Sequence, residues 1–234
     1  MVAIFRYICV MLKKSLIIFI VLVGFAKSYS QTDSIFVDNK YLEDQFYFSL
    51  DYNLLVNKPS GFNQNGISGG VTLGYIRDFP LNKRRNVALG VGLGYAYNAY
   101  NQNLKISDNG LYEIISNDDF NSNRLTTYAI ELPIEFRWRT SSATTYSFWR
   151  IYTGVKLGYV FANKSKYTDD IDIIKVKNID EFQNFQYGLT LSAGYSSFNL
   201  SLYYGLNPLF KDAYAEGNLI KLKQFNIGLM FYIL

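Results

Sequence analysis

The stretch that decides the fold runs from Phe46 to Leu54 and reads FYFSLDYNL. Its even positions carry large apolar or aromatic side chains, and the odd positions between them read Tyr47, Ser49, Asp51 and Asn53. A side-chain period of two is typical of a β-strand with one oily face and one polar face. This stretch therefore predicts a strand that separates an apolar environment from a polar one.

Seven further segments repeat this alternation, and none shows a longer helical pattern. They cover residues 67–77, 87–98, 128–139, 149–161, 185–195, 198–206 and 225–233. Eight such strands predict a closed barrel with lipid outside and a polar lumen inside. We expect an all-β fold, an eight-stranded antiparallel transmembrane up-and-down β-barrel, whose last strand closes on the first.

The first 30 residues have the features of a secretory signal peptide. Basic residues come first, an apolar core runs from Leu16 to Phe25, and small residues precede Gln31. Met11 lies just before a pair of lysines and is an alternative start of translation. We expect a signal peptide at residues 1–30, a periplasmic lead-in at residues 31–43 and an outer-membrane barrel domain at residues 44–234.

The links between the segments are alternately long and short. Outer-membrane barrels pair short periplasmic turns with longer outer loops, so both termini are expected in the periplasm of a Gram-negative bacterium. Trp138 and Trp149 then fall near the periplasmic interface, and Tyr97 and Phe161 fall near the outer one. Such aromatic girdles are common at both edges of a membrane barrel.

Six charged side chains fall on the polar faces of the fourth and fifth segments, and are therefore expected in the lumen. They are Glu131, Glu135, Arg137, Arg139, Arg150 and Lys156. In one strand register Glu131 opposes Lys156, and in another Glu135 opposes Arg150. Because an unpaired buried charge is costly, we expect a salt-bridge network that fills and stiffens the barrel. A proton or ion relay is the alternative.

Two further features concern the backbone of the segments. Pro133 lies inside the fourth segment and cannot donate a ladder hydrogen bond, so we expect a bulge or a local opening there. The glycines Gly90, Gly92 and Gly94 lie in a strand and open no helix, which argues against a nucleotide loop. We expect them to make room in a narrow lumen that is filled by its own side chains.

Composition excludes several classes of function. The four basic residues of the signal peptide account for the whole formal charge of +4, so the mature chain is neutral and does not favour nucleic-acid binding. Cys9 leaves with the signal, and the chain has no histidine. Barrel enzymes of lipid metabolism generally use a histidine base, so we expect no enzyme, no catalytic residue and no cofactor. Acidic loop stretches, Asp118-Asp119 and Asp169-Asp170, are expected to be solvated rather than to bind calcium.

One short link concentrates positive charge on the side expected to be periplasmic. It contains Lys83, Arg84 and Arg85 in succession. These side chains are able to reach anionic lipid headgroups, and the alternative is a docking surface for a periplasmic partner.

Four motifs resemble those of the PorT family of the Bacteroidota. They are the lead-in Tyr41–Tyr47, the loop Asn57–Gly61, the turn Pro80–Asn86 and the strand Leu93–Tyr97. The resemblance implies an outer-membrane component of the type IX secretion system, with outer-membrane lipid and other components of that system as partners, and gliding motility in some members. It supplies no catalytic residues. The competing interpretation is a small structural or adhesive barrel that contacts ligands through its long outer loops.

Overall fold

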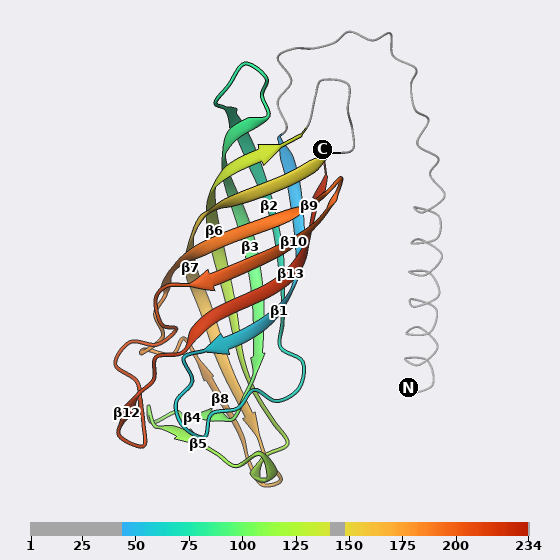
Figure 1. Ribbon diagram of the computed structural model, residues 1–234. Helices are drawn as coiled ribbons and strands as arrows, with labels where there is room; N and C mark the ends of the chain where they lie inside the picture. Colours follow the sequence, from blue (N-terminus) through green and yellow to red (C-terminus); the bar gives the residue numbers. More distant parts are fainter. Residues whose placement is uncertain (1–43, 141–147, 234) are drawn as a thin grey trace, which may run out of the picture. The chain divides into compact units, whose positions relative to one another are not determined.

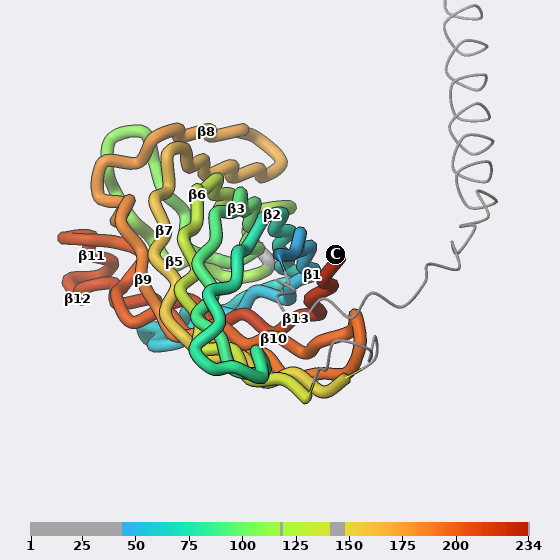
Figure 2. Tube along the Cα trace, turned by 90° about the horizontal axis from the view of Figure 1, so that it is seen from above, coloured from blue at the N-terminus to red at the C-terminus, as the bar shows by residue number. Residues whose placement is uncertain are grey.

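The protein is a closed, eight-stranded antiparallel barrel, as predicted. The computed structural model describes residues 44–140 and 148–233; the predicted signal peptide and lead-in lie outside the described residues. The barrel strands are β1 (Gln45–Val56), β2 (Gly69–Pro80), β3 (Val87–Asn101), β6 (Ser122–Arg139), β7 (Trp149–Thr168), β9 (Phe185–Tyr195), β10 (Phe198–Gly205) and β13 (Lys223–Ile233). Each pairs with its neighbour in the chain order, and β13 closes on β1 (Figures 1 and 2).

The long links contain short elements of their own. These are β4 (Leu104–Ile106), β5 (Tyr112–Ile114), the 3-10 turn η1 (Asn117–Asp119), β8 (Ile173–Lys177), β11 (Tyr214–Ala215) and β12 (Asn218–Leu219). They gather at one end of the barrel, here called the loop end (Figure 1). The short links from β2 to β3 and from β9 to β10, and the end of β13, lie at the opposite end, here called the turn end (Figure 1). No helix among the described residues is long and apolar enough to cross a bilayer.

The two faces of the barrel wall differ in polarity, as the alternation predicts. In β1, Phe46 is 63% exposed on the outside, whereas Tyr47 is 6% exposed and Ser49 2% exposed inside. The other barrel strands likewise expose large apolar side chains outward and bury polar ones. An apolar exterior around a polar interior suits a protein whose outer surface contacts lipid.

Aromatic side chains gather at both edges of this apolar surface. At the turn end, the rings of Trp149 and Tyr195 have centroids 5.3 Å apart. Toward the loop end, the ring of Tyr128 lies 5.5 Å from that of Tyr97 and 6.5 Å from that of Phe161. Two such bands are what aromatic girdles at the two interfaces require.

The structure confirms one of the two alternatives predicted at Pro133, a local opening of the ladder. The local opening is present, because the ladder between β3 and β6 is interrupted opposite Pro133 while the register on its two sides is unchanged. The bulge is elsewhere: the register of β6 and β7 shifts between Tyr128 and Ala129. Beyond this bulge β6 and β7 continue further than predicted, to Ser122 and Thr168, and protrude at the loop end with β8 paired to β7.

The inward glycines make room for larger side chains, as predicted. A Cβ added at Gly90 would meet the Arg137 side chain, and one added at Gly94 would meet the Tyr47 hydroxyl. Tyr47 also lies over Gly74 of the neighbouring strand. Small residues on one strand therefore receive bulky residues of another, which fills a lumen of this width.

Candidate functional site

A buried charge cluster occupies the lumen at the turn end. The two guanidinium groups of Arg137 and Arg139 contact the two carboxylate oxygens of Asp78, and all three side chains are fully buried. Nη2 of Arg137 also donates to Oε1 of Gln45 at 2.6 Å, and its guanidinium lies 3.9 Å from the centre of the Tyr152 ring. The single carboxylate of Asp78 thus offsets one of the two arginine charges where the side chains are shielded from solvent.

Asp78 is a site residue that sequence reasoning missed. The predicted second segment ended at residue 77, which left Asp78 in the adjoining turn. In the structure β2 continues to Pro80 and Asp78 faces the lumen. Asp78 has an even number, like Thr72 and Gly74, which face the lumen from the same strand. This alternation is the sequence signal that would have placed Asp78 in the lumen.

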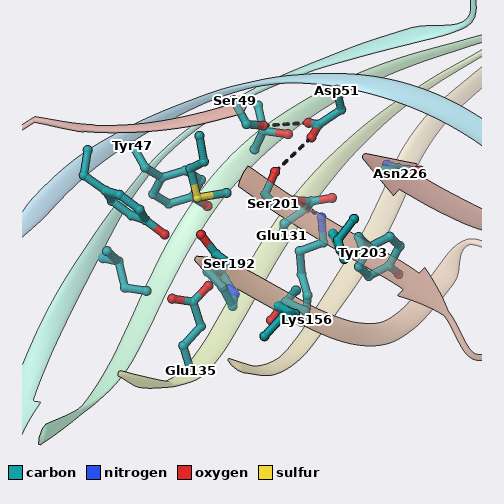
Figure 3. A pocket seen from close by; sticks show the side chains of 18 residues that line it. Tyr47, Ser49, Asp51, Glu131, Glu135, Lys156, Ser192, Ser201, Tyr203 and Asn226 are labelled. Carbon is teal, nitrogen blue, oxygen red and sulfur yellow. Dashed lines mark hydrogen bonds and ion pairs between the residues drawn. The ribbon is translucent and has the colours of Figure 1, made fainter. Parts of the chain in front are cut away.

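A second ion pair lies in the middle of the lumen. Nζ of Lys156 is 2.9 Å from Oε2 of Glu131, and 4.2 Å from the centre of the Tyr203 ring. Both charged side chains line a small cavity (Figure 3). Asp51 lies on another part of the cavity wall, where it accepts a hydrogen bond from Ser49 at 2.6 Å and one from Ser201 at 3.5 Å.

The strand register is neither of the two considered from sequence. Glu131 opposes Gly158 and Glu135 opposes Gly154, so Lys156 reaches Glu131 diagonally along the wall. The predicted partnership of Glu135 with Arg150 is wrong, because Oε2 of Glu135 instead lies 3.7 Å from Nε of Arg137.

Arg150 lies apart from these ion pairs. Its guanidinium packs 4.5 Å from the Phe148 ring and 5.6 Å from the Tyr232 ring. Nε and Nη1 are buried without a hydrogen-bond partner in the described part of the chain. Cation–aromatic packing is therefore the contact that the structure gives this arginine.

The lumen contains too little free space for a pore. A cavity in the lumen has a volume of about 40 Å³. The side chains that line it include Tyr47, Glu131, Glu135, Lys156 and Tyr203. A site needs roughly 10–15 Å³ for one water molecule, so the space suffices for only a few. The arrangement can hold charges and water in place, but it gives no room for a polypeptide or a solute.

The loop end is closed by a packed cap, which was not predicted. Apolar side chains from the long links pack with residues in the parts of the barrel strands nearest the loop end. The cluster includes Leu55, Phe62, Tyr100, Leu104, Ile106, Tyr112, Leu125, Phe182, Leu209, Phe210, Ile220 and Leu222. Because an apolar layer separates the polar lumen from this end, it interrupts the path that a proton or ion relay needs. The signal for the cap was the presence of large apolar residues inside links that were read as loops.

Contacts between different links hold the cap together. Ala215 of β11 pairs with Tyr112 of β5, which joins the last long link to the second. The Tyr112 hydroxyl donates to Oε2 of Glu181 in the third link at 2.8 Å. Burial, and then this hydrogen bond to a carboxylate, raise the pKa of Tyr112 well above its usual value.

A wide groove crosses the outer surface of the cap. It has a volume of about 790 Å³, and five of its lining residues carry carboxylates: Glu113, Asp119, Glu181, Asp212 and Glu216. Among the described residues, no group of three or more acidic, cysteine or histidine side chains is placed to hold a metal ion. At the tip of the third link, the carboxylate of Asp169 accepts backbone hydrogen bonds from Asp172 and Ile171, and these lower its pKa.

The basic turn lies between β2 and β3 at the turn end. Lys83 and Arg84 are exposed, but Arg85 is half-buried, has a positive φ of 56°, and accepts a hydrogen bond on its carbonyl oxygen from Nη2 of Arg139 at 3.0 Å. The three cations are therefore not equivalent. Lys83 and Arg84 are available to a partner, whereas Arg85 also supports the charge cluster in the lumen.

Comparison with known families agrees with the geometry. A family model described as "Outer membrane protein beta-barrel domain" matches residues 29–211. The chain belongs to this family. A membrane-type barrel of this family places the protein in the outer membrane of a Gram-negative bacterium.

Solved structures of one bacterial protein are similar to this outer-membrane barrel. They are those of Ail, the attachment invasion locus protein of Yersinia pestis. Its complex with sucrose octasulfate has 15% identity and a TM-score of 0.43, and the match covers 82% of this chain and 99% of that chain. Its structure in a phospholipid bilayer nanodisc has 15% identity and a TM-score of 0.36, and the match covers 82% and 100%. No curated protein sequence matches this outer-membrane barrel.

Proposed function

We propose that the protein is a non-enzymatic accessory component of the type IX secretion system, which acts through its two ends and not through its lumen. The observation that carries the second half of this proposal is the closure of the barrel. Arg137, Arg139 and Asp78 fill the turn end, and the apolar cap covers the loop end. A filled eight-stranded barrel passes no protein, so a role in secretion has to be that of anchoring, assembling or gating a larger translocon.

The assignment to secretion rests on the resemblance to the PorT family. Two of the four motifs, the loop Asn57–Gly61 and the turn Pro80–Asn86, lie in links where a barrel strand alone does not dictate the residues. In that reading, the loop end faces the outside and both termini lie in the periplasm. The turn with Lys83, Arg84 and Arg85 then faces the periplasmic parts of the machinery, where its cations pair with an acidic surface.

A clean deletion tests the secretion role. We expect proteins that bear type IX export domains to accumulate in the periplasm of the deletion strain, and complementation with the intact chain to restore their export. A complementing chain with Lys83→Gln and Arg84→Gln should insert normally but export poorly. The matched control is Lys211→Gln with Lys221→Gln, which removes two exposed cations at the loop end. Normal export in the deletion strain would contradict the secretion role, and normal export by the first variant would contradict the contact site.

The orientation is testable by labelling. The only cysteine, Cys9, belongs to the predicted signal peptide. A single cysteine introduced into the barrel is therefore the only thiol of the mature chain that a maleimide can label. Ser116→Cys at the loop end should react with a membrane-impermeant maleimide in intact cells, whereas Asn82→Cys at the turn end should react only after the outer membrane is opened. The reverse pattern would contradict the proposed orientation.

A structural or adhesive barrel is the second candidate, and the acidic groove of the cap favours it. The cap holds that groove in one shape through contacts such as Tyr112 with Glu181, and a preorganised surface binds with a smaller ordering cost. The discriminating experiment is to replace Glu113, Asp212 and Glu216 by glutamine. Loss of surface contact with intact export supports adhesion, and loss of export with intact contact supports secretion.

A further inference from the structure

Five cations lie on one face of the sheet where β6, β7 and β8 pair at the loop end. They are Arg124 of β6, Lys164 and Lys166 of β7, and Lys175 and Lys177 of β8. Arg124 opposes Lys166, which opposes Lys175, and Lys164 opposes Lys177. We call these five residues the basic face.

The bulge after Tyr128 puts the two β7 lysines on this face. On the turn-end side of the bulge, odd-numbered residues of β7 such as Tyr159 and Phe161 point outward. On the loop-end side of the bulge, the odd-numbered Ser165 and Tyr167 are buried, and Lys166 is exposed. A bulge re-aims side chains by inserting one residue. Without it, both lysines would point inward.

Repulsion makes this arrangement unfavourable for the isolated chain. Directly opposed residues on one face have Cβ atoms about 4.5–5.5 Å apart, where like charges destabilise a sheet. In the part of the chain that the structure describes, none of the five cations forms an ion pair. Nε of Arg124 donates to Oδ1 of Asn101 at 2.9 Å.

Protection of a free strand edge does not account for the basic face. β8 is the outer strand of this sheet, and lysines on edge strands discourage pairing with other chains. That reason covers Lys175 and Lys177 only. Arg124, Lys164 and Lys166 lie on strands that are paired on both sides, so another cause is needed for them.

The position of the basic face identifies its partner. It continues the outward, lipid-facing side of the barrel wall and begins directly beyond the aromatic band that contains Tyr128 and Phe161. Lys164 lies two residues past Ala162, the partner of Tyr128, which is about 7 Å along a strand. Aromatic girdles mark the headgroup level. The cations therefore lie among the lipid headgroups and just beyond them, toward the loop end.

We propose that the basic face binds the phosphate groups of lipid A, the phosphorylated saccharide lipid of the outer leaflet. The naming of the leaflet rests on the orientation proposed above, while the binding itself does not depend on secretion. Two rows of cations on a rigid sheet present several ammonium groups and one guanidinium to phosphates of neighbouring lipids. The bound phosphates offset the repulsion within the sheet.

Purified barrel in zwitterionic detergent micelles tests this proposal with bisphosphorylated lipid A as the probe. The test variant is Lys166→Gln with Lys175→Gln and Lys177→Gln. The matched control is Lys58→Gln with Lys211→Gln and Lys221→Gln, three exposed lysines elsewhere at the loop end. Mobility of unboiled samples on a detergent gel verifies that each variant is folded. The readouts are lipid A retained per barrel after gel filtration and the shift in unfolding temperature on adding lipid A.

We expect the test variant to lose affinity for lipid A by about tenfold or more, because each cation near a charged lipid surface adds to the attraction. The control variant should bind as the unchanged barrel does. Binding should weaken with added salt and persist in EDTA, since the contacts are direct. Equal binding of dephosphorylated lipid A, or unchanged binding by the test variant, would overturn the proposal. So would stronger binding of a soluble sulfated polysaccharide at equal anion concentration, which would identify a soluble polyanion as the partner.

Discussion

Nζ of Lys156 on β7 lies 2.9 Å from Oε2 of Glu131 on β6, in the wall of the lumen cavity. The two residues are not directly opposed, since Glu131 faces Gly158. Lys156 lies two residues before Gly158 on β7, so its side chain reaches Glu131 diagonally along the wall. The ion pair thus depends on the length of the lysine side chain.

Removal of one partner of this pair should destabilise the barrel more than removal of both. Lys156→Met leaves the Glu131 carboxylate buried without a cation, which should cost about 3–5 kcal/mol of unfolding free energy. The double variant with Glu131→Gln should cost less. Urea titrations of the folded barrel measure both, with the exposed Lys58→Met as a control. If Lys156→Met alone and Glu131→Gln alone each leave the unfolding free energy unchanged, the pair does not contribute to stability.

The contact of Tyr47 with Gly94 predicts a specific rescue. Gly94→Ala places a methyl group against the Tyr47 hydroxyl, and overpacking of this kind costs about 1–3 kcal/mol. Tyr47→Phe removes that hydroxyl and should restore much of the loss. The same Phe should not rescue Gly74→Ala, because the added methyl there meets the ring itself. Equal rescue of both variants by Tyr47→Phe would contradict this packing.

The cap should loosen at alkaline pH. The folded-state pKa of Tyr112 is raised, so its contribution is fully present below the ordinary tyrosine pKa of about 10 and is lost as the pH rises above it. Tyr112→Phe keeps the ring in the cap but has no proton to lose. Compared with this variant, the unchanged protein should lose more of its unfolding free energy between about pH 9 and pH 11. Parallel pH profiles of the two proteins would contradict the prediction.

The filled lumen predicts an electrically silent barrel. In planar bilayers the purified protein should show no steady open-channel current, because the cavity of about 40 Å³ does not connect the two ends. A general porin in the same bilayers serves as the positive control. A reproducible unit conductance from the folded barrel would mean that the cap or the arginine cluster opens.

The fold was predictable because its main signal is local. A period of two is imposed by the geometry of each strand, so Phe46 and Tyr47 already indicate which side meets lipid and which meets the lumen. The inward placement of Glu131, Glu135 and Lys156 follows from the same count. Strand ends were less certain, and Asp78 was missed because a strand has no local mark where a turn begins.

The amino-acid sequence by itself determined the eight strands, their two faces and most of the charges of the lumen, though not Asp78, since these depend only on neighbours along the chain. Only the tertiary structure decided which charges meet, as with Lys156 and Glu131, because pairing depends on register between strands. It also decided the outward turn of Lys166, which follows from a bulge, and the cap, where Tyr112 meets Glu181. Contacts between residues far apart in the chain leave no period to read.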